Sequence, residues 1–131
     1  MGGTTDTELI KMVNDLGIKN FRGCYMRDTL EDRPLQYECG IINFQGEMEG
    51  NGTHWTAWFK KGETKIFFDS FGTNPPDELQ KYLGKGILST TFQVQKINSD
   101  ICGELSILVL YLLDRGHKFE DIILDIVYKL R

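Results

Sequence analysis

Residues 52–72 read GTHWTAWFKKGETKIFFDSFG, and this stretch decides the fold. Two runs within it, Thr53–Lys60 and Thr64–Ser70, are rich in Trp, Phe, Thr and Ile, which is typical of β-strands. Lys61 and Gly62 lie between the two runs and predict a tight two-residue turn. The stretch therefore predicts a β-hairpin.

The predicted hairpin brings two chemically active side chains together. With the turn placed there, Lys60 pairs with Glu63. The same register places His54 directly opposite Asp69. Directly opposite residues share one face of the sheet, with Cβ atoms roughly 4.5–5.5 Å apart. We therefore expect the Asp69 carboxylate to orient the imidazole and to fix which ring nitrogen faces a nucleophile.

A thiol follows at the start of an apolar helix, which we predict to begin at Asp100 or Ile101 and to end at Leu113. Cys102 lies in its first turn, where unsatisfied N–H groups and the macrodipole favour a thiolate. The Cys102 backbone N–H and the Gln95 side-chain amide can form an oxyanion hole. An imidazole, a carboxylate, an amide donor and a thiol are the parts that a cysteine protease needs.

Each of these residues also has a purely structural interpretation. A cysteine at a helix start is usually a small core residue, and a single strand histidine is more often structural than catalytic. Asp69 can simply form a turn, and Gln95 can face solvent from a strand. The pairing of His54 with Asp69, together with Cys102 at a helix start, favours catalysis over these alternatives.

The remaining patterns predict an α+β fold, a small and mainly antiparallel sheet with flanking helices, as one domain over residues 1–131. Thr5 and Glu8 form a capping box that begins a helix ending at Leu16. The other predicted elements are strands at Tyr37–Phe44 and Thr91–Lys96, helices at Asp77–Leu83 and Phe119–Leu130, and loops at Gly23–Pro34 and Gln45–Gly52.

Composition limits the class of function. A net charge of −4 argues against a strong non-specific binder of nucleic acid. The three cysteines, Cys24, Cys39 and Cys102, follow no signal sequence, which predicts unbridged thiols in a reducing compartment rather than secretion. No apolar run approaches the ~20 residues of a membrane span. Two histidines and no Cys-x-x-Cys pair predict that there is no structural zinc site.

Three motifs occur in a fixed order along the chain. They are Gly52-Thr53-His54-Trp55, Phe68-Asp69-Ser70-Phe71-Gly72, and Gln95 followed seven positions later by Cys102-Gly103. In this order they resemble the adenovirus protease (adenain) family, and the resemblance extends over Thr5–Leu113. That family shares its core with the Ulp1-type SUMO and ubiquitin-like proteases. The resemblance therefore implies a papain-like, Ulp1-like cysteine protease core.

The resemblance also implies a role for each motif residue. Cys102 is the nucleophile, His54 the general base and then acid, Asp69 the orienting carboxylate, Gln95 an oxyanion donor, and Gly52, Trp55 and Gly103 bind substrate. In that family a peptide activator forms a disulfide with the protease, and DNA is a cofactor. Gly84 occupies the position of the bridging cysteine here, and the net charge is negative. We therefore predict no cofactor, with peptide or DNA activation as the alternative that the family offers.

The implied function is a monomeric cysteine endopeptidase that cleaves viral capsid and core precursors, near glycine, during virion maturation. The implied location is the virion and the cytoplasm or nucleus of an infected cell. Two alternatives stay open. One is a deconjugating isopeptidase for ubiquitin-like proteins, whose tails also end in Gly-Gly. The other is an inactive peptide-binding module with the same fold, against which the complete set of catalytic residue types argues.

Overall fold

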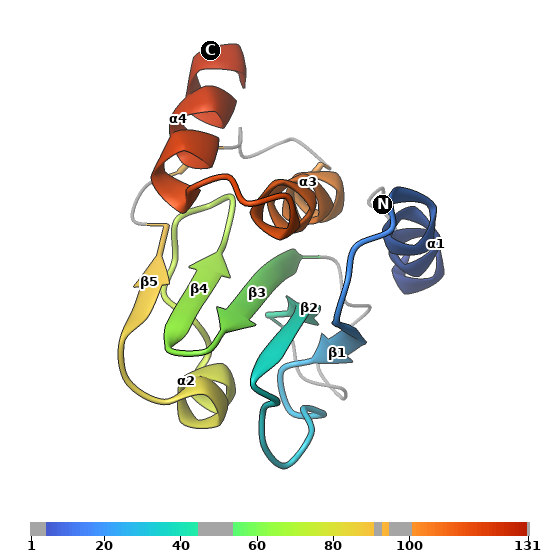
Figure 1. Cartoon of the computed structure of the whole chain (residues 1–131), viewed down its shortest axis with the longest axis vertical. Helices are drawn as coiled ribbons and strands as arrows, with labels where there is room; N and C mark the ends of the chain where they lie inside the picture. The colour runs from blue at the N-terminus through green and yellow to red at the C-terminus, as the bar shows by residue number, and fades with distance from the viewer. Residues whose placement is uncertain (1–4, 45–53, 91–92, 95–100, 131) are drawn as a thin grey trace.

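The structure is a computed structural model that describes residues 5–44, 54–90, 93–94 and 101–130. Its strands are β1 (Phe21–Met26), β2 (Tyr37–Asn43), β3 (Trp55–Lys61), β4 (Thr64–Phe68) and β5 (Ile87–Ser89). Its helices are α1 (Asp6–Leu16), α2 (Asp77–Leu83), α3 (Cys102–Asp114) and α4 (Phe119–Leu130). The strands form one sheet in the order β1-β2-β3-β4-β5 (Figure 1).

The sheet is mixed in direction. β2, β3 and β4 run antiparallel to one another, whereas β1 and β5 run parallel to their neighbours at the two edges. Each parallel pair requires a crossover connection. Residues 27–36 provide it between β1 and β2, and α2 lies within the connection from β4 to β5. The α+β class is confirmed, and the antiparallel arrangement holds for the three central strands.

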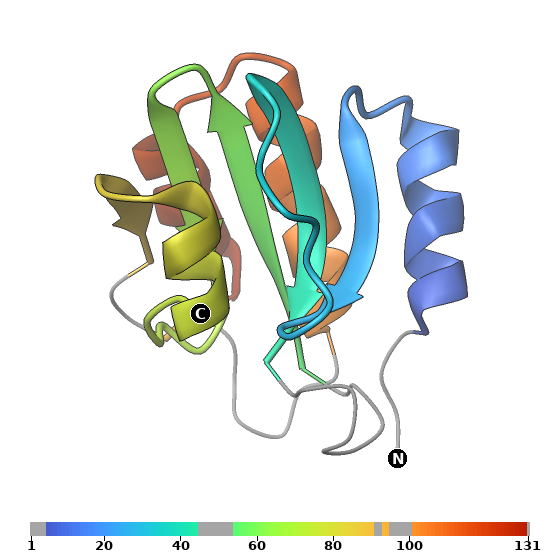
Figure 2. The same cartoon turned by 90° about the horizontal axis from the view of Figure 1, so that it is seen from below.

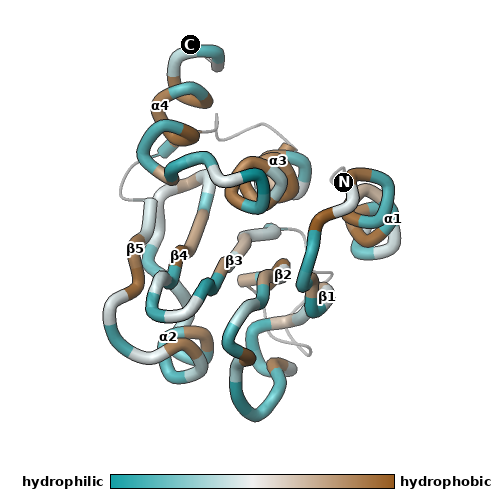
Figure 3. Tube along the Cα trace, viewed as in Figure 1, coloured by the Kyte–Doolittle hydropathy of each residue, from teal (hydrophilic) through white to brown (hydrophobic). Residues whose placement is uncertain are grey.

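Helices cover both faces of the sheet (Figure 2). α3 and α4 pack on one face, α2 and residues 27–36 lie on the other, and α1 stands beside β1 at the edge. Alternating strand side chains supply two cores, because successive residues point to opposite faces. Trp55 and Phe68 belong to the main core beneath α3, whereas Trp58 and Phe67 belong to a second core beneath α2. The apolar character of α3 is evident in Figure 3.

The local helix signals are confirmed in the structure. The Glu8 N–H donates to Thr5 Oγ1 at 3.2 Å, and the Thr5 N–H donates to Glu8 Oε1 at 2.9 Å, which completes the predicted capping box. α2 and α4 occupy the predicted ranges. None of the described helices combines the length and hydrophobicity that a membrane crossing requires.

Two edge strands differ from the prediction. The predicted loop Gly23–Pro34 is wrong in its first part, because β1 reaches Met26. The β1 register shifts between Phe21 and Cys24, and all six residues of the strand are half-buried, so no regular alternation marks it in the sequence.

At the opposite edge the fifth strand is Ile87–Ser89, too short to show a periodic pattern. The strand predicted at Thr91–Lys96 is absent from residues 93–94, and its other positions lie outside the described residues. The loop predicted at Gln45–Gly52 also lies outside them.

The hairpin register differs from the prediction by two positions. Lys61 pairs with Thr64, so the turn residues are Gly62 and Glu63. Gly62 has a φ of 61°, and glycine at the first loop position is the pattern of a type II′ turn. A shift of two preserves the face on which each side chain lies. His54 and Asp69 therefore stay on one side of the sheet, but diagonally rather than directly opposite.

A buried carboxylate joins four segments on the α2 side. Glu38 is 1% exposed. Its Oε1 accepts from Arg22 Nη1 at 3.1 Å and from the Leu35 N–H at 2.8 Å. Its Oε2 accepts from Trp58 Nε1 at 2.8 Å and from the Tyr82 hydroxyl at 2.7 Å. Because both oxygens are satisfied, the buried charge is compensated while it ties α2 to the sheet.

The substitution Glu38→Gln is expected to lower the free energy of unfolding by about 2–3 kcal/mol, because the amide replaces one acceptor by a donor that faces other donors. Denaturant unfolding monitored by circular dichroism measures this loss. Glu63→Gln, at the exposed hairpin turn, is the matched control and should change stability by less than ~0.5 kcal/mol. Equal effects of the two substitutions would contradict the role of the network.

Candidate active site

Three of the four predicted catalytic side chains meet at one end of the sheet. His54 immediately precedes β3, Asp69 immediately follows β4, and Cys102 is the first residue of α3. The ends of three elements thus position the three groups. Gln95 and Gly52 lie outside the described residues, so their roles stay predictions.

His54 and Asp69 form a short hydrogen bond. His54 Nε2 lies 2.7 Å from Asp69 Oδ1, and the Asp69 side chain is fully buried. A distance this short is typical of a charge-assisted bond. The other ring nitrogen, Nδ1, is buried and makes no hydrogen bond within the described residues. Since the carboxylate holds Nε2, Nδ1 is the nitrogen that can exchange a proton with a nucleophile or substrate.

The surroundings of His54 favour the imidazolium. Burial disfavours the charged ring, but the bond to Asp69 and the interaction with Cys102 outweigh burial and raise the pKa of His54 to about 9. For Asp69, burial disfavours the carboxylate, but His54, Thr73 and the Phe71 N–H together lower its pKa. At neutral pH the two residues are therefore a charged pair, and the positive ring can stabilise a thiolate.

Asp69 organises the turn after β4 as well as the imidazole. Its Oδ1 accepts from the Phe71 N–H at 3.0 Å in addition to His54. Its Oδ2 accepts from the Thr73 N–H at 3.0 Å and from the Thr73 hydroxyl. Asp69 therefore bonds to the turn and to the imidazole at the same time.

Two aromatic rings enclose the imidazole, and the sequence did not predict either contact. The Phe71 ring stacks on His54 with centroids 4.5 Å apart and an interplanar angle of 9°. The Phe44 ring lies 5.6 Å from His54 at 48°. Aromatic faces attract a cation, so both rings favour the imidazolium and restrict its plane. No sequence signal marks the stacking of Phe71, because the chain after Asp69 forms a turn in which side chains do not alternate as in a strand.

Cys102 is buried and contacts the strand that follows His54. Its Sγ accepts a hydrogen bond from the Trp55 N–H at 3.4 Å. Cys102 is the first residue of α3, and the N-cap residue, Ile101, makes no side-chain capping bond. The sulfur therefore lies at the helix end toward which the backbone N–H groups of α3 point.

The two predicted substrate-binding residues near Cys102 are largely internal. Trp55 is 4% exposed, and its ring lies in the main core. At Gly103 a Cβ would lie 3.0 Å from Leu9 Cδ2 and 3.4 Å from Trp55 Cδ1. The close approach that this glycine permits in the structure is therefore that of α3 to α1 and β3.

The other two cysteines differ chemically from a nucleophile. Burial raises the pKa of both the Cys24 and Cys39 thiols to about 12, and the nearby Asp6 adds to the effect at Cys24. Both thiols are therefore protonated at neutral pH. None of the three cysteines forms a disulfide. Within the part of the chain that the structure describes, no cluster of His, Cys, Asp or Glu could hold a metal ion.

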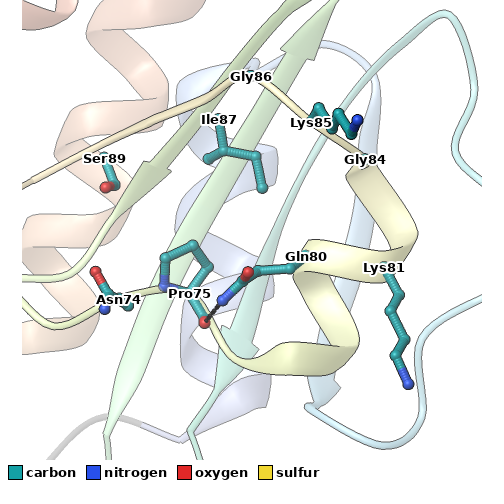
Figure 4. Close-up of a pocket in the computed structure, with 9 residues that line it drawn as sticks. All are labelled: Asn74, Pro75, Gln80, Lys81, Gly84, Lys85, Gly86, Ile87 and Ser89. Atoms are coloured by element: carbon teal, nitrogen blue, oxygen red, sulfur yellow. Dashed lines mark hydrogen bonds between the residues drawn. The ribbon is translucent and has the colours of Figure 1, made fainter.

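Surface pockets do not all coincide with this site. The pocket of about 570 Å³ in Figure 4 lies between α2 and β5, and none of the three catalytic candidates lines it. Within it, Gln80 Nε2 donates to the Pro75 carbonyl at 2.8 Å. A different pocket, of about 530 Å³, is lined by Phe44 and the start of α2. Because Phe44 packs against His54, this second pocket adjoins the site.

Comparison with known proteins identifies the architecture. No protein-family model and no curated protein matches the sequence. The crystal structure of the pS273R protease of African swine fever virus (ASFV) matches 98% of this chain with a TM-score of 0.62 and 15% identity. The chain has the fold of a Ulp1-like cysteine protease. It spans 65% of the length of the pS273R chain.

A second crystal structure of the same protease, in its selenomethionine form, matches 74% of this chain and 43% of its own, with a TM-score of 0.48 and 20% identity. The predicted Ulp1-like core is thus confirmed by the first comparison, and the narrower resemblance to the adenovirus protease family stays a prediction.

Titration of His54 by NMR tests the electrostatics of the site. We expect a midpoint of about 9 in the wild type. In Asp69→Asn it should fall toward the ordinary value of about 6.5, because the compensating carboxylate is lost. Since the folded pKa lies above the unfolded value, His54 stabilises the fold fully below about 6.5, and this contribution disappears as the pH rises through 9. His117→Gln assigns the signals, and a wild-type midpoint near 6.5 would exclude the charged pair.

Proposed function

We propose that the protein is a cysteine endopeptidase with Cys102 as its nucleophile and His54 as its base. One observation carries the proposal: the bond of 2.7 Å between His54 and Asp69 lies where β3, β4 and the start of α3 meet, beside the Cys102 sulfur. The interaction of Cys102 with the imidazole and the Trp55 N–H supports the same assignment. The protease fold of the structural neighbour agrees with it.

The geometry supports a two-step hydrolysis. The Cys102 thiolate attacks the carbonyl carbon of the scissile peptide bond, and the oxyanion is bound by the Cys102 N–H and, in this proposal, by Gln95. His54 Nδ1 donates its proton to the leaving amine as the C–N bond breaks and a thioester forms. A water molecule then attacks the thioester while Nδ1 takes its proton. The acid product leaves, and the thiolate is restored.

The proposed substrates are viral capsid and core precursors that carry glycine near the scissile bond. This preference rests on the motif resemblance to the adenovirus protease family. The pocket lined by Phe44 and the start of α2 supports a docking groove for one side of such a chain, because it adjoins His54. The proposed sites of action are the virion and the infected cell.

Deconjugation of a ubiquitin-like protein is the second candidate, and the Ulp1-like fold favours it. The two candidates differ in the bond that is cleaved. Comparing a linear peptide with Gly-Gly before the scissile bond with an isopeptide of the same sequence on a lysine side chain distinguishes them.

The substitution Cys102→Ala is expected to abolish cleavage of a co-expressed capsid precursor, because no thiol remains beside His54 to form the thioester. Gel analysis of the precursor measures this loss, and circular dichroism verifies the fold. Cys24→Ala is the matched control and should process the precursor normally. Equal processing by Cys102→Ala and wild type would remove the nucleophile assignment.

The substitution Asp69→Asn is expected to reduce kcat by up to ~10⁴-fold, because the amide no longer holds the imidazole as a cation with the correct nitrogen presented. Steady-state hydrolysis of a glycine-containing peptide measures this effect. Near-normal turnover would show that Asp69 serves the turn alone.

A further inference from the structure

The backbone of Trp55 lies beyond the ladder that joins β3 to β4. That ladder ends at the pair Ala57–Phe68. On the β2 side, the carbonyl of the neighbouring His54 accepts from the Phe44 N–H at 3.2 Å. Backbone groups of consecutive strand residues point to alternate sides. The N–H and C=O of Trp55 therefore point away from β2, toward the side on which β4 has already ended.

Two side chains of α3 occupy the place of the ladder partner. The Trp55 N–H donates to Cys102 Sγ at 3.4 Å, and the Trp55 carbonyl accepts from the Ser106 hydroxyl at 3.3 Å. Cys102 and Ser106 are four residues apart, so they lie on one face of the helix, one turn from each other. α3 is thus bound to β3 through both the N–H and the C=O of Trp55.

The hydroxyl of Ser106 is buried among apolar side chains of the main core. Ser106 is fully buried, and its neighbours on α3, Leu105 and Ile107, are buried apolar residues of the main core. A buried hydroxyl is costly unless it is hydrogen-bonded. Here its bond goes to the one residue whose N–H also holds the candidate nucleophile.

We propose that Ser106 is a positioning residue for Cys102. Its bond to the Trp55 carbonyl fixes the rotation and depth of the first turn of α3, and hence the place of the sulfur relative to His54, which adjoins Trp55 in the chain. Without it, the first turn of α3 keeps the N–H···S contact and its apolar packing but loses the hydrogen bond to the Trp55 carbonyl, so the turn can shift. The effect on rate rests on the proposed function, in which attack tolerates only small displacements.

The substitution Ser106→Ala tests the proposal with a peptide that ends in Gly-Gly joined to aminomethylcoumarin. We expect kcat to fall about ten- to a hundredfold, because a displacement of about 1 Å at the reacting atoms has that effect, while KM stays unchanged. Ser106→Thr keeps the hydroxyl and should restore most of the rate.

A matched control is available on the same strand. Thr56 is fully buried, and its hydroxyl donates to the Ile42 carbonyl at 2.7 Å, away from α3. Thr56→Val removes this bond and leaves the contacts of α3 intact, so kcat should be retained. If Thr56→Val and Ser106→Ala lower kcat equally, the loss reflects general destabilisation and the proposal is overturned. Comparing kcat of Thr56→Val with kcat of Ser106→Ala tests the positioning role even if Ser106→Thr fails to fold.

A readout without substrate separates this inference from the proposed function. The rate of Cys102 alkylation by iodoacetamide, followed by mass spectrometry across pH, reports how well the protein stabilises the thiolate. Ser106→Ala should slow alkylation of Cys102 at neutral pH, whereas Thr56→Val should not. If iodoacetamide alkylates Cys102 of the wild type faster than that of Ser106→Ala, but the wild type hydrolyses no peptide, the result counts against the proposed function only. Identical profiles and kinetics for Ser106→Ala and wild type would exclude the positioning role.

Discussion

The arrangement of the site depends on a difference in length between two neighbouring strands. β3 begins at Trp55, whereas its ladder with β4 ends at the pair Ala57–Phe68. The chain turns away from the sheet at Asp69, and the carboxylate there binds the imidazole instead of extending the ladder. The start of α3 fills the remaining place, with its thiol on the Trp55 N–H. Had β4 continued, its backbone would pair with Trp55 and displace the sulfur. Three chemically useful groups therefore meet because a regular ladder stops early.

The opposite face of the sheet combines a small apolar core with the hydrogen bonds of one buried carboxylate. The core beneath α2 is the smaller of the two, and Glu38 supplies much of its order through bonds to Trp58 and Tyr82. Because α2 follows the turn that starts at Asp69, the docking of α2 limits where that turn can run. Glu38 in β2 thus supports the position of Asp69 from the opposite face of the sheet, without touching it.

The sequence predicted features that depend on local pattern. The placement of His54 and Asp69 on one face survived an error of one position in the turn, because this error shifts the cross-strand register by two and side-chain direction repeats every two residues. The signal for α3 was equally local: the helix was predicted from Asp100 or Ile101 to Leu113, and the structure has it at Cys102–Asp114. The edge strands β1 and β5 were missed because short parallel strands are defined by distant partners. The contacts of Phe71 and Ser106 were missed because they exist only where β4 ends, and no pattern in the sequence shows where a ladder stops.

Both tryptophans of the chain lie on β3, three residues apart and on opposite faces of the sheet. Trp55 touches the site through its backbone and the main core through its ring, whereas the indole N–H of Trp58 is bonded to Glu38. The intrinsic fluorescence of the chain is therefore the sum of one reporter for each core. Replacing either indole by phenylalanine leaves the other as the only tryptophan, whose emission can be excited selectively over that of tyrosine. The unfolding of the α3 side and the α2 side can then be followed separately, without any attached dye.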